Sequence, residues 1–226
     1  MIFSYLQSGA DIKTIVTMLL LTLPIVLLAL CLHETAHGYV AYKLGDPTAR
    51  SLGRLTLNPL KHLDPIGFLC MLGFGFGWAK PVPINTRYFK NPKRDMAICG
   101  LAGPVSNLLL SLVFAGLLRI FYETVSATPF ASEQSLYVAS LIYTFLTLGI
   151  RLNIGLAVFN LLPIPPLDGS RLLTAVLPWR ISSKLIQYEQ IIAIVLMVGL
   201  WIGVLDPVLN FITSNLSNVI YSLFGL

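Results

Sequence analysis

Charged side chains are scarce in this sequence of 226 residues: Asp, Glu, Lys and Arg make up 11% of it, whereas hydrophobic residues make up 56%. A soluble domain usually carries about 25% charged residues. The composition therefore excludes an ordinary water-soluble protein and predicts an integral membrane protein. The net charge of +5 predicts no nucleic-acid partner, because the basic residues fall in segments that flank apolar runs.

Cysteine is also rare, with only Cys31, Cys70 and Cys99, all in apolar surroundings. No C-x-x-C pair occurs, which excludes a disulfide framework and a cysteine-ligated metal. The N-terminus lacks a basic segment followed by a cleavage site, so the first apolar segment is expected to be retained. The length predicts one membrane-embedded domain over 1–226, with a core at 14–177 and C-terminal helices at 185–226.

Long stretches without charge locate the expected membrane spans. They predict an all-α polytopic membrane protein with about five to six transmembrane helices. A shorter, glycine-rich uncharged stretch predicts a small interfacial re-entrant or β-hairpin segment near 65–90 instead of a span. The expected spans lie at 14–44, 96–118, 136–162, 190–205 and 207–225.

Basic residues predict the orientation, since cytoplasmic loops are enriched in Lys and Arg. Segments 43–94 and 168–189 together hold 12 of the 15 Lys and Arg residues. Five spans satisfy this distribution when the N-terminus lies outside. The chain is therefore expected in the cell membrane, as a multi-pass protein in contact with the lipid bilayer.

Three ionisable residues, His33, Glu34 and His37, follow directly after the first apolar run. Ionisable groups are costly at membrane depth and mark functional sites. On a helix the two histidines share one face, with the spacing at which two imidazoles bind one zinc and an adjacent Glu acts as general base. The alternative is a polar helix end that faces water. The pattern favours a metalloprotease that works inside the membrane, with its site near the cytoplasmic end of the helix.

A catalytic zinc needs a third protein ligand, and Asp168 is the strong candidate. It ends the segment N-L-L-P-I-P-P-L-D-G at 160–169, whose prolines prevent a continuous helix. A carboxylate at the start of the next helix could face back into the bundle. The alternatives are an ordinary helix N-cap for Asp168 and a helix C-cap for Asn160.

Together the two motifs resemble those of the site-2 protease family of intramembrane zinc metalloproteases, in its small prokaryotic members without CBS or PDZ domains. The resemblance implies one zinc ion per chain, held by His33, His37 and Asp168. It also implies that Glu34 activates the water and that Asn160 helps to stabilise the oxyanion. The implied function is hydrolysis of peptide bonds in transmembrane protein substrates near the cytoplasmic side. The similarity covers 32–177 and includes 45–49, 53–59 and 79–83.

Residues 73–90 alternate small, aromatic and polar side chains and are expected at the membrane interface. An exposed edge there could pair with an unwound substrate segment, or the segment could only anchor the fold. Trp78, Pro81 and Pro83 are the candidate substrate-binding residues. Asn107, on the second span, is a candidate for the same role, for helix packing, or for orienting groups of the site.

Two further polar residues have no assigned role. His62 is expected to pair with Asp64 in a loop. Arg151, within the third span, is expected to snorkel or to bind carbonyl groups, with Glu34 and Asp168 as the other partners considered.

Three other functions fit parts of the pattern. In a zinc protease with a glutamate as third ligand, a Glu would be needed in a motif, but Glu123, Glu133 and Glu189 lie near span ends. A metal-binding or transport protein without protease activity would usually show paired halves, and none is evident. An inactive relative would lack part of the motifs, which are complete.

The sequence leaves open the substrate, the regulatory trigger, the source organism, homo-oligomerisation and the role of the last two helices.

Overall fold

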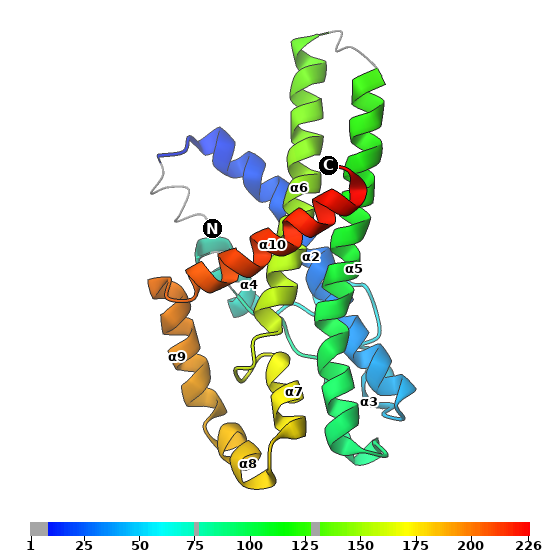
Figure 1. Ribbon diagram of the computed structural model, residues 1–226, viewed down its shortest axis with the longest axis vertical. Helices are drawn as coiled ribbons and strands as arrows, with labels where there is room; N and C mark the ends of the chain where they lie inside the picture. The colour runs from blue at the N-terminus through cyan, green and yellow to red at the C-terminus, as the bar shows by residue number, and fades with distance from the viewer. Residues whose placement is uncertain (1–8, 75–76, 128–131) are drawn as a thin grey trace.

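The computed structural model describes residues 9–74, 77–127 and 132–226, and these residues are mostly helical (Figure 1). No β-strand occurs among the described residues. In chain order the elements are α2 (Ile12–Lys43), α3 (Thr48–Ser51), η1 (Pro59–Lys61), α4 (Pro65–Phe74), η2 (Thr86–Tyr88), α5 (Pro92–Ala127), α6 (Glu133–Asn160), α7 (Gly169–Val176), α8 (Trp179–Gln187), α9 (Glu189–Ile202) and α10 (Asp206–Phe224).

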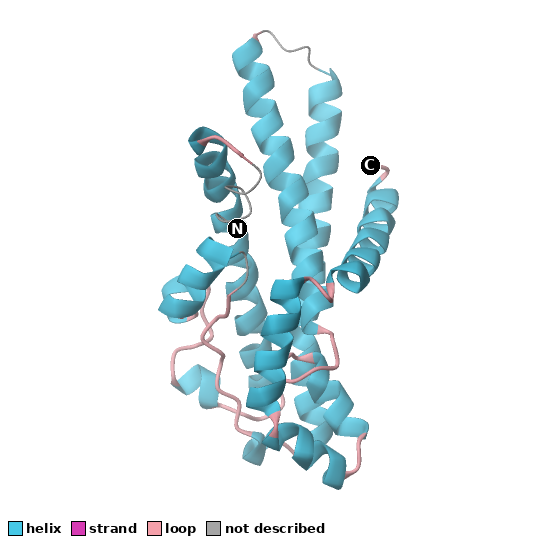
Figure 2. Ribbon diagram, turned by 90° about the vertical axis from the view of Figure 1, so that its left-hand side faces the viewer, coloured by secondary structure: helices cyan, strands magenta, loops and turns pink. Residues whose placement is uncertain are grey.

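The centre of the molecule is the crossing of α2 with the antiparallel pair α5 and α6. In Figure 1, α10 lies obliquely across α6 and α5, and α7 lies beside the first half of α5. Figure 2 shows the loops gathered around the lower half of the molecule, away from the tip of the α5–α6 pair. The main core joins α2, α5, α6 and α10 through buried residues that include Ile25, Ala29, Phe114, Leu118, Ile150, Ile154 and Ile220.

Local sequence signals explain where the long helices begin. The Asp11 side chain accepts a hydrogen bond from the Thr14 N–H at 3.3 Å and caps α2. Ser132 and Ser135 cap α6 by reciprocal hydrogen bonds between side chain and main chain. Pro24 lies inside α2 without ending it, as is tolerated where neighbouring helices satisfy the freed backbone group.

Three of the described helices, α2, α5 and α6, are long and apolar enough to cross a membrane. A fourth span results if α8 and α9, which are bent by 64° relative to each other, count as one. The three central spans agree with the sequence prediction, but the expected total of five to six is not confirmed. The helices after α6 are the reason: α7, α8 and α9 are each too short to span a membrane alone, and α10 is not among the helices that are apolar enough.

The β-hairpin expected near 65–90 is also not confirmed. Residues 65–74 form α4, residues 75–76 lie outside the described part of the chain, and the extended stretch after them forms one isolated bridge, between Leu63 and Ala79. The neighbouring Lys80 N–H donates to the His62 carbonyl at 2.7 Å. The extended stretch therefore pairs with a loop rather than with a second strand.

The pairing of His62 with Asp64 is wrong. His62 is buried, and its Nε2 contacts the Thr56 carbonyl oxygen at 2.7 Å. Asp64 instead accepts a hydrogen bond from the Gly67 N–H at 2.8 Å, which caps α4. Both side chains therefore bond to main-chain groups and not to each other. Asp64 directly precedes a helix that begins with proline, so its carboxylate is already placed to cap that helix.

Close contact between α5 and α6 gives a prediction about stability. A Cβ at Gly149 would overlap the buried Phe114 ring, whereas a Cβ at Gly155 on the same helix would meet no atom within 4 Å. Gly149→Ala is expected to lower the free energy of unfolding by about 1–3 kcal/mol through overpacking. Gly155→Ala, the matched control, is expected to leave it unchanged or to raise it by up to about 1 kcal/mol through helix propensity. Thermal unfolding of the two variants in detergent, followed by circular dichroism, measures the difference. Equal stability of the two variants would contradict the close contact between Gly149 and Phe114.

Candidate active site

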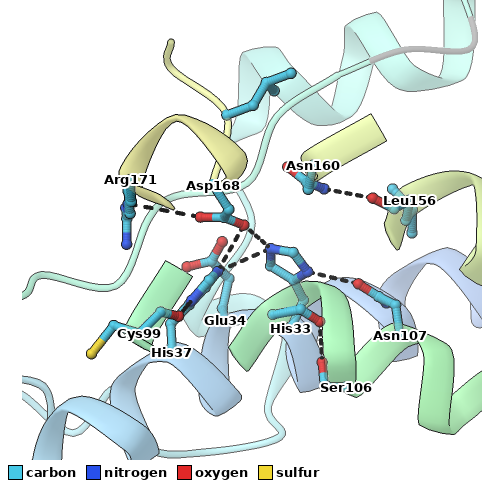
Figure 3. A network of polar contacts seen from close by, with 12 residues as sticks. His33, Glu34, His37, Cys99, Ser106, Asn107, Leu156, Asn160, Asp168 and Arg171 are labelled. Atoms are coloured by element: carbon cyan, nitrogen blue, oxygen red, sulfur yellow. Dashed lines mark hydrogen bonds and ion pairs between the residues drawn. The ribbon is translucent and has the colours of Figure 1, made fainter. Parts of the chain in front are cut away.

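Helix α2 supplies the first part of the site. His33 and His37 are buried one helical turn apart, with ring centroids 4.7 Å apart and planes at 83°. Their Nε2 atoms are 3.1 Å from each other. Figure 3 shows both rings directed toward Asp168. The four-residue spacing thus places two nitrogen ligand atoms at one point, as the sequence predicts.

Asp168 reaches this point from a distant part of the chain. After α6 ends at Asn160, a proline-containing turn returns the chain to the bundle and α7 begins at Gly169. The Asp168 Oδ2 atom lies 3.0 Å from the Nε2 atoms of both His33 and His37. Although Asp168 occupies the N-cap position of α7, its side chain makes no capping hydrogen bond, so the alternative of an ordinary N-cap is wrong.

Hydrogen bonds on the far side of each imidazole determine its tautomer. Asn107 uses its amide nitrogen to donate to the Ala29 carbonyl and to Asn153 Oδ1, so its own Oδ1, 2.6 Å from His33 Nδ1, accepts. The Cys99 carbonyl oxygen lies 2.6 Å from His37 Nδ1, and a carbonyl oxygen can only accept a hydrogen bond. Both Nδ1 atoms of the neutral rings therefore carry the proton, and both Nε2 atoms present lone pairs.

The residues fit a bound metal ion. Asp168 adds a carboxylate oxygen, which in its ionised form can only accept hydrogen bonds or bind a cation. Two nitrogen lone pairs and a carboxylate oxygen, 3.0–3.1 Å apart, repel one another unless a cation lies between them. Ligands 2.0–2.1 Å from a tetrahedral zinc are about 3.3 Å apart. Among the described residues, His33, His37 and Asp168 form the one group of His, Cys, Asp or Glu placed to hold a metal.

Helix α5 approaches these ligands through a glycine. A Cβ at Gly103 would lie within contact distance of the Nε2 atoms of both His33 and His37. Only a residue without a side chain allows α5 to pass this close to the metal ligands. The same approach brings Asn107, one turn further along α5, to the Nδ1 side of His33.

Glu34 faces a cavity of about 300 Å³ that the three metal ligands also line. Its Oε2 accepts a hydrogen bond from the Val82 N–H at 2.8 Å. This bond ties the extended stretch after α4 to the side of α2 that carries the site. The carboxylate is thus held beside the metal ligands by a main-chain donor, which is the position of a general base.

Two buried residues from the loop after α2 hold the same extended stretch. The buried Asp46 accepts a hydrogen bond from the Asn85 N–H at 2.7 Å. The Arg54 guanidinium donates from Nη2 to the Lys80 carbonyl at 2.7 Å. With the bond to Glu34 between them, these contacts fix residues 80–85 of the stretch that forms one wall of the cavity.

The remaining sequence candidates lie around this cavity to different degrees. Trp78, Pro81 and Asn160 line the cavity, whereas Pro83 is not among its lining residues. Asn160 is the last residue of α6, and its amide donates to the Leu156 carbonyl at 3.0 Å, which leaves its second amide hydrogen outside this bond. Both polar atoms of Asn107 are occupied by protein groups, which favours the orienting role over contact with substrate.

Sequence reasoning missed several residues of the site. Asn153 continues the hydrogen-bond chain from Asn107 and donates to the Gly149 carbonyl at 2.8 Å; an amide within an apolar span was the available signal. Arg171, three residues after Asp168, lines the cavity. Arg151 lies instead on a neighbouring, mainly apolar cavity between α2, α4, α6, α9 and α10.

Comparison with known proteins identifies the family. The model for peptidase family M50 matches residues 21–205, which include every metal ligand described above. The chain belongs to peptidase family M50. This is the site-2 protease family, so the resemblance inferred from the two motifs is confirmed.

Relatives in this family extend across bacteria and archaea. The chain is 45% identical over 183 residues to YwhC of Bacillus subtilis, whose name describes a candidate zinc metalloprotease; the match covers 79% of this chain and 81% of that protein. It is 31% identical over 207 residues to Rip2 of Mycobacterium tuberculosis H37Rv, covering 88% of this chain and 71% of the relative. The zinc metalloprotease MJ0392 of Methanocaldococcus jannaschii is 27% identical over 193 residues, 85% of this chain and 43% of its own length. No solved structure matches.

The family and the names of these relatives identify the chain as a zinc metalloendopeptidase of family M50.

The bond between His33 and Asn107 gives a prediction about metal binding. Asn107→Ala removes the acceptor that fixes the tautomer of His33, and loss of such outer partners typically weakens metal affinity by about 10–100-fold. The control is Ser106→Ala, because the Ser106 hydroxyl donates to the Gly103 carbonyl within α5, at 2.7 Å. Zinc competition with a fluorescent chelator, on purified protein in detergent, measures the affinity. Equal zinc affinity in the two variants would contradict the orienting role.

Proposed function

We propose that this M50 protease hydrolyses peptide bonds of transmembrane protein substrates inside the membrane, near its cytoplasmic face. The observation that supports this is that His33, Glu34 and His37 lie on α2, a helix apolar enough to span a bilayer, and that Asp168 meets the two imidazoles there. Ionisable residues are energetically costly in apolar surroundings, so their presence there indicates a functional site.

We propose His33, His37 and Asp168 as the ligands of one zinc ion and Glu34 as general base. Zinc, when bound, supplies a Lewis acid that polarises the scissile carbonyl and lowers the pKa of water. Glu34 takes a proton from the attacking water and passes it to the leaving amine, so the new C–O bond and the broken C–N bond balance. Val82 holds the carboxylate through its N–H, 2.8 Å away, so it is oriented before substrate arrives.

Asn160 is proposed to donate its second amide hydrogen to the oxyanion that develops on the scissile carbonyl. It lines the same cavity as Glu34 and lies at the end of α6. The bond to Leu156 keeps this amide at the cavity wall. A preorganised donor of this kind typically contributes about 10²–10³ in rate.

The extended stretch of 77–85 is proposed to bind substrate. A helical peptide bond is protected from attack, so a transmembrane substrate must unwind before cleavage. An extended wall offers main-chain groups for pairing with such a segment. Trp78 and Pro81 lie on that wall, and Pro83 follows directly after Val82, the residue that anchors it to Glu34.

The proposed topology has five spans in one domain, the N-terminus outside, and α9 and α10 as the last two spans. The basic segments 43–94 and 168–189 would then lie in the cytoplasm, with α8 at the cytoplasmic boundary before α9. His33 and His37 lie in the part of α2 that leads into the first of these segments, and Asp168 is the first residue of the second. Site and basic loops thus fall toward the same side.

The central test is cleavage of a single-span substrate by purified protein in detergent. Glu34→Gln is expected to retain zinc and to lose about 10²–10⁴-fold in cleavage rate, because the general base is absent. Rates come from gel-based product formation and zinc content from elemental analysis. Normal cleavage by this variant would refute the assignment of the base.

A companion variant tests the third ligand. Asp168→Asn replaces the anionic oxygen with an amide and is expected to lower zinc retention during dialysis, together with activity. The matched control is Asp206→Asn. Asp206 is exposed at the start of α10 and is not among the residues that line the cavity, so this variant is expected to keep its zinc content. If Asp168→Asn kept its full zinc content, Asp168 would not belong to the ligand set.

A further inference from the structure

Arg171 is a charged residue of the cavity that the proposed mechanism does not use. It lies three residues after Asp168, so both side chains fall on one face of the first turn of α7. Its Nε is 3.8 Å from Asp168 Oδ1, the carboxylate oxygen that does not face the histidines. The guanidinium is therefore placed beside the metal ligand without competing for the ligating atom.

Helix α5 holds the stem of Arg171 in this position. A Cβ built on Gly100 would lie 2.9 Å from the Asp168 main-chain oxygen, 3.1 Å from the Arg171 Cβ and 3.2 Å from its Cδ. The glycine thus lets α7 pack directly on α5. A side chain held by its aliphatic stem has already lost much of its rotamer freedom, so it loses less on binding a ligand.

One end of the guanidinium lacks a partner. The Nη1 atom of Arg171 is buried and has no hydrogen-bond acceptor among the described residues. A buried charged donor without an acceptor is costly, and such groups usually serve a ligand or a reaction. Arg171 lines the catalytic cavity together with Glu34 and Asn160, and it also lines a second cavity between α5, α7 and α8. A molecule that enters the catalytic cavity can therefore bring the missing acceptor.

We propose that Arg171 is a substrate-binding residue that donates a hydrogen bond to a main-chain carbonyl oxygen of the peptide in the cavity. This inference rests on the proposed function. An unwound transmembrane segment has few polar side chains, and its carbonyl oxygens are the acceptors that it necessarily brings. Figure 3 shows Arg171 and Asn160 on opposite sides of Asp168. Arg171 therefore binds a carbonyl group other than the scissile one, for which Asn160 is the proposed donor.

The test measures binding separately from chemistry. In the Glu34→Gln background a fluorescent single-span peptide stays uncleaved, and its Kd is determined by anisotropy in detergent. Adding Arg171→Gln is expected to raise the Kd by about 10–100-fold, the usual effect of losing a hydrogen bond to a charged group. Arg171→Lys, which keeps the charge but not the planar fork, is expected to raise it by about 3–10-fold. Arg180→Gln on α8, an exposed residue, is the control and is expected to leave the Kd unchanged.

Zinc content of the same samples separates binding from a structural effect through Asp168. Retained zinc together with a raised Kd supports the proposal, and in the active background the KM then rises while kcat changes little. An unchanged Kd, or a raised Kd accompanied by zinc loss, overturns it. If Arg171→Gln does not elute as a folded species, Arg171→Lys decides by the same criteria. Absence of any binding by Glu34→Gln alone would instead overturn the proposed function and, with it, this inference; a failure confined to the Arg171 variants leaves that function intact.

Discussion

Two imidazole lone pairs and one carboxylate oxygen repel one another at the centre of this protein, and the surrounding helices are arranged to hold them together. These atoms lie 3.0–3.1 Å apart in a buried pocket, and only a cation makes such an arrangement favourable. Three separate elements must meet there: the last third of α2, the first half of α5 and the turn before α7. The proline-containing segment that leads to Asp168 serves this convergence, because it turns the chain back into the bundle where a continued α6 would carry it away.

The bundle around the site satisfies its buried polar groups almost entirely with one another. Asn107 and Asn153 are fully buried, and their amides connect α2, α5 and α6 in one chain of hydrogen bonds that ends at His33. In an apolar environment helices gain little from hydrophobic burial against lipid, so close packing and interhelical hydrogen bonds hold them together. Gly103 and Gly149 provide the close packing, one beside the metal ligands and one beside Phe114. The contacts of Gly103 and Asn107 therefore serve both metal binding and helix association.

The cavity wall is held by backbone rather than by a sheet. The stretch of 77–85 is fixed at Lys80 by Arg54, at Val82 by Glu34 and at Asn85 by Asp46. Because each contact uses a main-chain group, the side chains of this wall can vary without loss of its position. Relatives from Bacillus, Mycobacterium and Methanocaldococcus share the family, and a backbone-held wall is compatible with different substrates on one catalytic scaffold.

The membrane class, the three central spans and the pairing of two histidines with a distant aspartate could all be predicted from the amino-acid sequence. Its signals are local or chemical: charge-free runs, a four-residue spacing on a helix, and an acidic residue next to a proline-rich break. The residues that surround these groups and hydrogen-bond to them became known from the three-dimensional structure. The Asn107–Asn153 chain, the glycine beside the imidazoles, the partner of His62 and the open end of Arg171 depend on contacts between residues far apart in sequence. The hairpin was not confirmed for the same reason, since an alternating pattern fixes local conformation but not the partner against which the segment packs.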